Sequence, residues 1–143
     1  CLIRLDWDQS RFSAPDNPDD VSRETSDQLI TYLGGTLKDF RLPVRAEGKL
    51  AADHAWLEVM ARIPYSAVVT YAEFAAAAGK PGASRAAGTA CSTNPIPIIY
   101  PCHRVVRAGG TLGNYGGGSY LDPKHPENLG RKQALIDPER QFA

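Results

Sequence analysis

Two short helices joined by a tight turn are predicted between residues 70 and 92, and this pair constrains the fold more than any other stretch. Thr70-Tyr71-Ala72-Glu73 is a capping box, in which the threonine hydroxyl caps the helix and the glutamate reaches back to the free amide. The first helix continues through an alanine run and stops at Gly79. Pro81 suits the start of a second helix that runs from residue 83 to about residue 92. The segment is therefore predicted to be a helix-turn-helix.

The second predicted helix reads Ala-Ser-Arg-Ala-Ala-Gly-Thr-Ala-Cys-Ser, with Arg85 as its single long side chain. Side chains that read base edges in the major groove are long and polar, so this helix is poorly suited to sequence readout. A surface of small residues can lie close against a narrow groove, where one arginine enters the minor groove or the base stack. The composition favours sequence-independent DNA binding, and an ordinary well-packed helix is the alternative.

The charges of the chain are unevenly distributed although the formal net charge is zero. Residues 1–73 carry 12 acidic and 8 basic side chains, whereas residues 74–143 carry 4 acidic and 8 basic ones. No Asp or Glu occurs between Glu73 and Asp122. An acid-free stretch of this kind suits a polyanionic partner such as nucleic acid.

The run Pro101-Cys102-His103-Arg104-Val105-Val106 follows the proline-rich segment Asn94-Pro95-Ile96-Pro97 and precedes a glycine-rich stretch over residues 109–118. Sulfur is a strong nucleophile once a neighbouring base raises its thiolate fraction, and glycines let the backbone approach a bound group closely. We therefore expect a cysteine nucleophile in a tight pocket built largely from backbone. The cysteines number three, without a disulfide framework or the spacing of a zinc site, which predicts a reducing compartment and no metal.

These motifs together resemble the O6-alkylguanine-DNA alkyltransferase family. The resemblance covers residues 48–118 strongly and the C-terminal tail more loosely. It rests on Trp56, Ile63-Pro64, Thr70-Tyr71, Gly79-Lys80-Pro81, Ser84-Arg85-Ala86-Ala87-Gly88, Asn94-Pro95-Ile96-Pro97, the Pro101–Val106 run and Gly113-Asn114-Tyr115.

The resemblance implies a DNA repair protein that flips O6-alkylguanine, and also O4-alkylthymine, out of duplex DNA. The alkyl group moves irreversibly to Cys102, so each molecule acts once, as a methylated-DNA–protein-cysteine methyltransferase without cofactor or metal. Flipping is required because the reacting atom is inaccessible inside the base stack. The implied partner is double-stranded DNA bound through the minor groove by a monomer.

The resemblance also implies roles for residues around the cysteine. His103 matches the base, and a bridging water is expected because adjacent side chains of an extended segment point to opposite faces. Glu139 falls where the family has the carboxylate that orients this histidine, with Asp137 close by. Asn94 matches the asparagine that braces the helix-turn-helix against the active-site turn. Tyr71 matches the tyrosine implicated in base flipping and in proton donation to the departing guanine.

DNA and base contacts are implied in the same way. Arg85 matches the finger that fills the gap left by the flipped base, on a helix that presents Ser84, Ala86 and Gly88 to DNA. The carbonyl groups of Cys102 and Val105 would read the exocyclic amine of guanine. A backbone N–H near Gly116 would face O6, and the pocket lining would include Tyr115 and Pro97.

We expect an α+β fold in which residues 1–47 form a small ribonuclease-H-like lobe and residues 48–143 a mostly helical domain with a winged-helix-like helix-turn-helix. The first lobe is predicted to have a strand over residues 3–7, a helix ending near Leu33 and a short strand over residues 40–42. A further helix, residues 51–62, should bury a stripe containing Trp56 and Met60. Residues 119–128 look like an insertion, and Cys1 in place of Met indicates processing or trimming.

Other functions remain to be weighed. A non-catalytic alkyltransferase-like module binds damaged bases without repair, but such modules lack the acceptor cysteine that Cys102 supplies. A cysteine hydrolase would have its Cys and His far apart in the sequence, and a transcription factor would need longer side chains on its recognition helix. No apolar run is long enough to span a bilayer, and we expect a cytoplasmic protein, or a nuclear one in a eukaryote.

Overall fold

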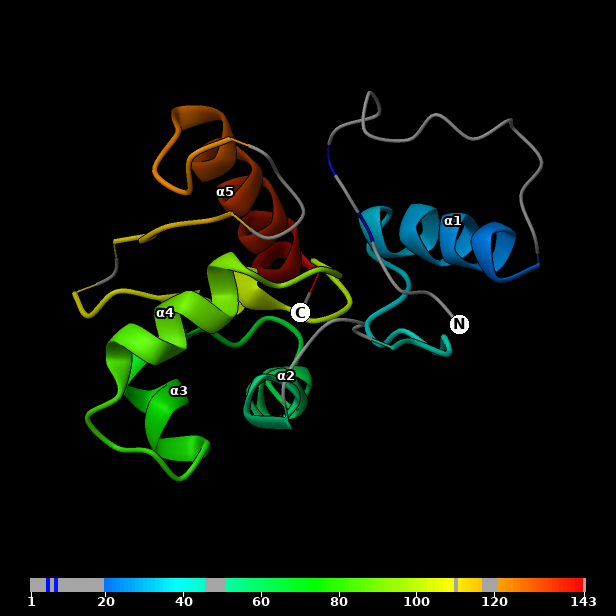
Figure 1. The fold of residues 1–143 in the computed structure, drawn as a ribbon. Helices are drawn as coiled ribbons and strands as arrows, with labels where there is room; N and C mark the ends of the chain where they lie inside the picture. Colours follow the sequence, from blue (N-terminus) through cyan, green and yellow to red (C-terminus); the bar gives the residue numbers. More distant parts are fainter. Residues whose placement is uncertain are drawn as a thin grey trace.

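The computed structural model describes residues 5, 7, 20–45, 51–109, 111–116 and 121–142, with the side chains of residues 51 and 52 left out. The fold is mixed but dominated by helices (Figure 1). Its elements, in chain order, are α1 (Asp20–Leu33), α2 (Ala51–Ala61), β1 (Val69–Thr70), α3 (Tyr71–Ala77), α4 (Ser84–Ser92), the 3-10 turn η2 (Cys102–Arg104), β2 (Val105–Val106) and α5 (Pro126–Gln141).

The predicted helix pair is confirmed as α3 and α4, which pack against each other. The capping box at the start of α3 is complete, because the Glu73 N–H donates to Thr70 Oγ1 at 3.1 Å and the Thr70 N–H donates to Glu73 Oε2 at 3.3 Å. Gly79, with a φ of 74°, turns the chain in the left-handed region that glycine adopts readily. The pair lies on the side of the molecule opposite α1 (Figure 1).

The predicted α2 stripe is also confirmed. Trp56 and Met60 are buried, as is Ile63 just beyond the helix. The Trp56 ring meets the ring of Phe74 from α3 edge to face at 5.1 Å, which attaches the helix pair to α2.

The segment around Cys102 differs from the extended conformation that was expected. Residues 102–104 form η2, and only Val105 and Val106 are extended, pairing in parallel with Val69 and Thr70 of β1. The Arg104 N–H donates to the Pro101 carbonyl oxygen at 3.0 Å, which tightens the chain into a turn before the strand. Successive side chains of a 3-10 turn point about 120° apart rather than to opposite faces.

The first part of the chain agrees with the prediction only in its helix. α1 ends at Leu33 as expected, and Gly35 follows it with a φ of 84°. The strand expected over residues 40–42 is wrong: the Gln28 side chain accepts from the Arg41 N–H at 2.9 Å and donates to its carbonyl at 3.1 Å. Of the strand expected over residues 3–7, the described residues Leu5 and Trp7 are not in a strand, and the others lie outside the described residues.

The C-terminal helix begins within the stretch that was expected to be an insertion. α5 starts at Pro126, capped by the His125 side chain, whose Nδ1 accepts from the Glu127 N–H at 3.1 Å. Residues 126–128 of the expected insertion are therefore helix, while residues 119 and 120 lie outside the described part. No helix within the described residues is long and apolar enough to cross a membrane. The ribonuclease-H-like and winged-helix-like details, and the boundary near residue 47, stay predictions.

Candidate active site around Cys102

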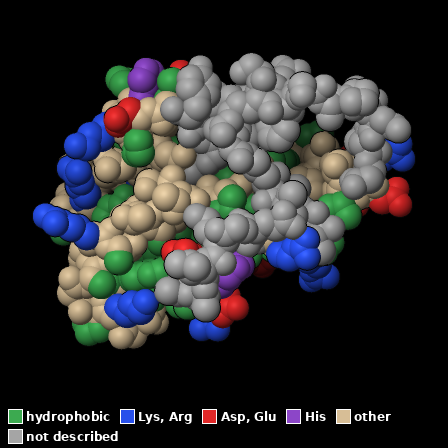
Figure 2. Space-filling view, viewed as in Figure 1, with side chains coloured by type: hydrophobic (Ala, Val, Ile, Leu, Met, Phe, Trp, Pro, Cys, Tyr) green, Lys and Arg blue, Asp and Glu red, His purple; other side chains and the backbone are tan. Residues whose placement is uncertain are grey.

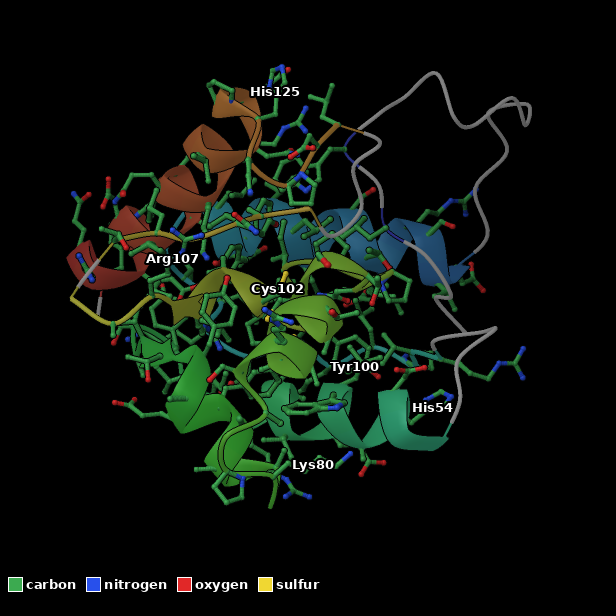
Figure 3. All side chains as sticks on the ribbon, turned by 60° about the vertical axis from the view of Figure 1, so that its left-hand side comes forward. His54, Lys80, Tyr100, Cys102, Arg107 and His125 are labelled. Atoms are coloured by element: carbon green, nitrogen blue, oxygen red, sulfur yellow. The ribbon has the colours of Figure 1, made fainter. Side chains whose placement is uncertain are left out.

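Cys102 is the first residue of η2 and lies in the interior, 2% exposed. Figure 3 shows it near the centre of the molecule, with His54 and His125 at the periphery. Burial raises the pKa of the Cys102 thiol, while a hydrogen bond from the Asn94 side chain and the charge of Lys132 act in the opposite direction. The thiol therefore needs a base in order to react.

His103 is completely buried beside the thiol-bearing residue. Its Nε2 lies 2.5 Å from Oε2 of Glu139, which comes from the last turns of α5. Asp137, two residues earlier, is exposed and accepts instead from the Gln133 side chain at 2.5 Å. The structure thus brings Glu139, and not Asp137, against the histidine.

Donors from separate parts of the chain surround the Glu139 carboxylate. The Tyr32 hydroxyl of α1 donates to Oε2 at 2.5 Å. The Ser66 N–H donates to Oε1 at 3.0 Å, from a residue with the left-handed φ of 67° that is uncommon outside glycine. Arg104, only 6% exposed, donates from Nε to Oε1 at 2.8 Å and from Nη2 to Oε2 at 3.2 Å, and its Nη1 donates to the Ile63 carbonyl at 2.6 Å.

This arrangement decides the protonation of the pair. Burial alone would raise the pKa of Glu139, but hydrogen bonds from His103 and Arg104 lower it to about 2, so the carboxylate is ionised. Burial lowers the pKa of His103, against the opposing effect of Glu139, so the imidazole is neutral. Since Oε2 can only accept, Nε2 carries the proton and Nδ1 has a free lone pair. Nδ1 is buried and has no hydrogen-bond partner among the described residues.

Asn94 lies between α4 and η2 and is 1% exposed. Its Nδ2 donates to the Tyr100 carbonyl at 2.8 Å, and its Oδ1 accepts from the Ile96 N–H at 3.0 Å. These contacts hold the turn that leads from α4 into the cysteine. Pro97 is buried within the same turn, whose next residue, Ile98, has a φ of 73°.

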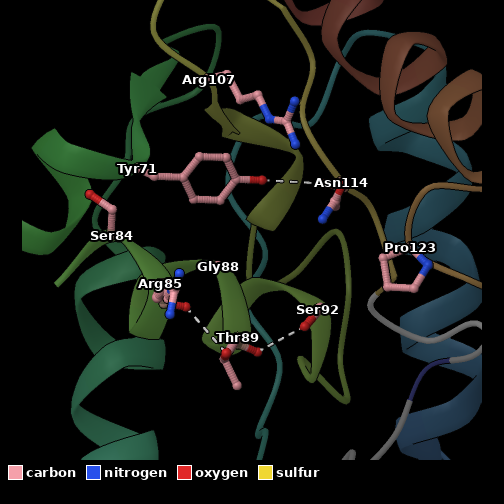
Figure 4. A pocket seen from close by; sticks show the side chains of 9 residues that line it. All are labelled: Tyr71, Ser84, Arg85, Gly88, Thr89, Ser92, Arg107, Asn114 and Pro123. Atoms are coloured by element: carbon pink, nitrogen blue, oxygen red, sulfur yellow. Dashed lines mark hydrogen bonds between the residues drawn. The ribbon is translucent and has the colours of Figure 1, made fainter.

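A pocket of about 420 Å³ opens beside α4 (Figure 4). The expected DNA-facing residues Ser84, Arg85 and Gly88 line it, whereas Ala86 is exposed outside it. Tyr71 lines the same pocket and donates from its hydroxyl to the Asn114 carbonyl at 3.4 Å. The remaining lining residues are Thr89, Ser92, Arg107, Asn114 and Pro123. Figure 2 shows Lys and Arg side chains along the edge of the molecule that carries α3 and α4.

The other expected base-contacting residues are not among those that line this pocket. Val105 and Tyr115 are buried, and the Val105 carbonyl already accepts from Lys132 Nζ at 2.6 Å. Gly116 needs to be glycine, because a Cβ there would lie 2.9 Å from Pro123 Cγ. Cys102 does not line the pocket in this conformation. No three His, Cys, Asp or Glu side chains gather as a metal site in the described part of the chain.

A family model, described as the DNA-binding domain of 6-O-methylguanine DNA methyltransferase, matches residues 51–141. The match takes in α2 through α5 and includes Cys102, His103 and Glu139. The chain belongs to the 6-O-methylguanine DNA methyltransferase family. The resemblance inferred from the sequence motifs is therefore confirmed.

Similar proteins carry matching names. A methylated-DNA–protein-cysteine methyltransferase from Mycobacterium bovis is 39% identical over 117 residues, which are 82% of this chain and 64% of that protein. One from Mycolicibacterium paratuberculosis is 36% identical over 142 residues, 99% of this chain and 79% of its own length. The chain thus spans less than two thirds of the Mycobacterium bovis relative.

A solved structure of this methyltransferase family supports the fold. The crystal structure of Mycobacterium tuberculosis OGT in complex with DNA matches with a TM-score of 0.73 at 37% identity, covering 85% of this chain and 68% of that chain. The two chains share their overall architecture at this level of similarity.

Sequence reasoning missed several residues of this site. Tyr32 is separated from Glu139 by 107 residues, and no local pattern links the two. Arg104 was given no part in the predicted site, and the structure places it on Glu139. Lys132 is completely buried, although lysine side chains are ordinarily exposed. Its burial could have been suspected only from the helical spacing that puts it on the same face of α5 as Leu135, Ile136 and Glu139.

Proposed function

We propose that this chain repairs O6-alkylguanine in duplex DNA by transferring the alkyl group to Cys102, once per protein molecule. One observation supports this most directly. A neutral His103 is held through Nε2 by an ionised Glu139, so that its Nδ1 is free to accept a proton beside a buried thiol. Glu139 thus occupies the place of the third member of a catalytic triad, a carboxylate that fixes the tautomer of the base.

The chemistry that these residues can perform balances without a cofactor. His103 Nδ1 accepts the Cys102 proton through a bridging water, and the thiolate attacks the alkyl carbon. The S–C bond forms as the bond from that carbon to guanine O6 breaks, and the electron pair stays with the base. A proton donated by Tyr71 neutralises the departing guanine, while Glu139 stabilises the imidazolium. The imidazolium then returns its proton through water to the Tyr71 phenolate, so that both residues end the reaction neutral.

The pocket beside α4 is where we propose that the flipped base enters. Its volume of about 420 Å³ lies within the usual range of small-molecule sites, roughly 300–1,000 Å³. Tyr71 lines the pocket beside α4. Its pKa is raised by burial and by Cys91 and Cys102 nearby. A raised pKa keeps the phenol protonated, as a proton donor requires.

DNA recognition follows from the composition of α4. Ser84, Ala86 and Gly88 present a surface without long side chains, and we propose that it lies in the minor groove. Arg85 is exposed on the pocket rim and is positioned to fill the space left by the flipped base. The protein is proposed to act as a monomer on double-stranded DNA.

The pocket interior is proposed to read the base mainly through backbone. Val105 and Cys102 would supply carbonyls to the exocyclic amine, and Gly116 an N–H to O6. Tyr115 and Pro97 would line the alkyl side, while Asn94 keeps the cysteine turn in register. The second lone pair of the Val105 carbonyl serves this role, since Lys132 occupies only one.

Intact-protein mass spectrometry with a duplex containing one O6-methylguanine tests the proposal. We expect one hydrogen to be replaced by one methyl per protein, mapped to Cys102, with no turnover in excess substrate. Cys102→Ser should bind the duplex and gain no mass, whereas Cys91→Ser, the other described buried cysteine, should still be methylated. Binding of the duplex without any mass change would instead favour the damage-recognition module and reject transfer. Repeating the assay with O4-methylthymine tests the second substrate.

A further inference from the structure

The last turn of α1 reaches the catalytic pair through one side chain. Tyr32 is 4% exposed, and its hydroxyl donates to Glu139 Oε2 at 2.5 Å. The same oxygen lies 2.5 Å from His103 Nε2. Tyr32 and His103 therefore share one acceptor atom, although α1 lies outside the stretch that matches the family model.

The tyrosine ring is held so that the hydroxyl has little freedom. It packs against Phe40 with ring centroids 5.2 Å apart and against Tyr65 edge to face at 6.1 Å. Burial and the hydrogen bond to Glu139 raise the pKa of Tyr32, so the hydroxyl stays protonated. Because the carboxylate oxygen only accepts, the direction of the hydrogen bond is fixed from Tyr32 to Glu139.

We propose that Tyr32 is a positioning residue for His103: its hydroxyl orients the Glu139 carboxylate and limits the negative charge offered to the imidazole. This rests on the proposed alkyl transfer, in which His103 is the base. A second donor on Oε2 disperses the charge of that oxygen, so the oxygen stabilises an imidazolium less strongly. Without the hydroxyl, Oε2 would stabilise the imidazolium form of His103 more strongly.

The other groups that act on the pair contact it differently. Arg104 of η2 donates to Oε1 at 2.8 Å and, over the longer distance of 3.2 Å, to Oε2, and it has its own anchor on the Ile63 carbonyl. Tyr65, after α2, packs beside Arg104 at 5.7 Å, and Lys38 lies over the Tyr65 ring at 5.5 Å. Lys132 of α5 lowers the pKa of His103 by its charge. Of the side chains described, Tyr32 is thus the one that competes with His103 for Oε2 by a neutral hydroxyl.

Tyr32→Phe removes the hydroxyl and keeps the ring, and Tyr65→Phe is the matched control from the same aromatic cluster. We expect Tyr32→Phe to raise the pKa of His103 by about one unit, the size of one charge-assisted hydrogen bond. The ¹³C shift of the His103 ring measures this pKa on DNA-free protein, with assignment by comparison with His103→Gln. The base must be neutral to accept the proton. At pH values below the His103 pKa, the methyl-transfer rate of Tyr32→Phe should therefore be up to about tenfold lower than that of the wild type, and at pH values above it the two rates should match.

The transfer rate is followed in single-turnover assays between about pH 5 and pH 8, the range in which histidine switches. A purely structural role would lower the rate by one factor at every pH, and that result overturns the proposal. An unchanged His103 titration in Tyr32→Phe, or an equal shift in Tyr65→Phe, also overturns it. If Tyr32→Phe does not fold, uniform 3-fluorotyrosine labelling provides the second test. The more acidic phenol should donate more strongly and lower the pKa of His103, and no downward shift overturns the proposal.

The two hypotheses fail in different ways. A chain that transfers no methyl group but shows the histidine shift in Tyr32→Phe would reject the proposed function and leave the Tyr32 contact in place. A chain that transfers methyl normally with an unshifted histidine would reject the role of Tyr32 alone.

Discussion

Lys132 Nζ lies 2.6 Å from the Val105 carbonyl oxygen, and this buried contact joins α5 to the strand that follows the proposed alkyl acceptor. The same ammonium donates to the carbonyls of Leu112 at 2.5 Å and Asn114 at 3.1 Å. Asn114 also accepts from Tyr71 and lines the pocket. One cation therefore holds the strand and the pocket wall together.

Replacing Lys132 with methionine should destabilise the protein. The change leaves three carbonyl oxygens without this donor, and unsatisfied buried acceptors cost about 1–3 kcal/mol each, partly offset by removal of a buried charge. We expect a loss of about 2–4 kcal/mol in the free energy of unfolding, measured in urea. Lys124→Met, at an exposed position near the same loop, is the control and should change little. Equal free energies of unfolding for the two variants would contradict this role of Lys132.

Removal of the Arg104 side chain should be among the most costly single changes. Arg104→Leu leaves the buried Glu139 carboxylate without its bidentate partner and frees the Ile63 carbonyl. Breaking a buried ion pair by deleting one partner typically costs about 3–5 kcal/mol. The exposed Arg107→Leu should lie within about 0.5 kcal/mol of the wild type. Denaturation curves that coincide for these two variants would rule out the assigned pairing.

The low pKa of Glu139 makes a prediction about acid stability. Its folded value of about 2 lies below the ordinary value of 4.5, so the unfolded chain takes up this proton first as the pH falls. The stabilisation is complete above pH 4.5 and is lost progressively as the pH falls towards 2. Glu139→Gln should flatten the dependence of unfolding free energy on pH in this window, and Asp137→Asn should keep it. If the unfolding free energies of the wild type and Glu139→Gln depended on pH with the same slope in this window, the assigned pKa of Glu139 would be wrong.

Two helical glycines offer a paired test of the α4 surface. A Cβ at Gly88 of α4 or at Gly130 of α5 meets nothing within 4 Å, so alanine fits at both positions. Each change should stabilise the protein by up to about 1 kcal/mol, because alanine favours helix over glycine. Gly88→Ala should nevertheless raise the Kd for duplex DNA, since its methyl projects from the proposed groove-binding surface. Gly130→Ala should leave that Kd unchanged, and a similar Kd for both variants would argue against minor-groove contact through α4.

Local signals account for what the sequence could predict. The capping box at Thr70 and the turn at Gly79 specify α3 and its end through contacts a few residues apart, and both were confirmed. The apolar spacing of Trp56 and Met60 likewise identified α2. The family followed from motifs around Cys102 that are contiguous in the chain.

The missed features depend on contacts that no window of sequence contains. The strand expected over residues 40–42 was wrong because the Gln28 side chain, 13 residues away in the sequence, forms hydrogen bonds with the backbone N–H and carbonyl of Arg41. The turn at Cys102 replaces the expected extended chain because the Arg104 N–H closes back on Pro101. The contact between Tyr32 and Glu139 crosses 107 residues. Alternation and spacing carry no information about such closures.

The distribution of the Glu139 donors along the chain bears on biosynthesis. α5 follows every other described element, so Glu139 is made after Tyr32, Ser66 and Arg104, and its carboxylate meets them only when the helix docks. Until then His103 lacks the partner that fixes its tautomer, and Cys102 is an ordinary thiol on a growing polypeptide. On the proposed function, the pair that activates the alkyl acceptor is therefore complete only once the last helix has docked.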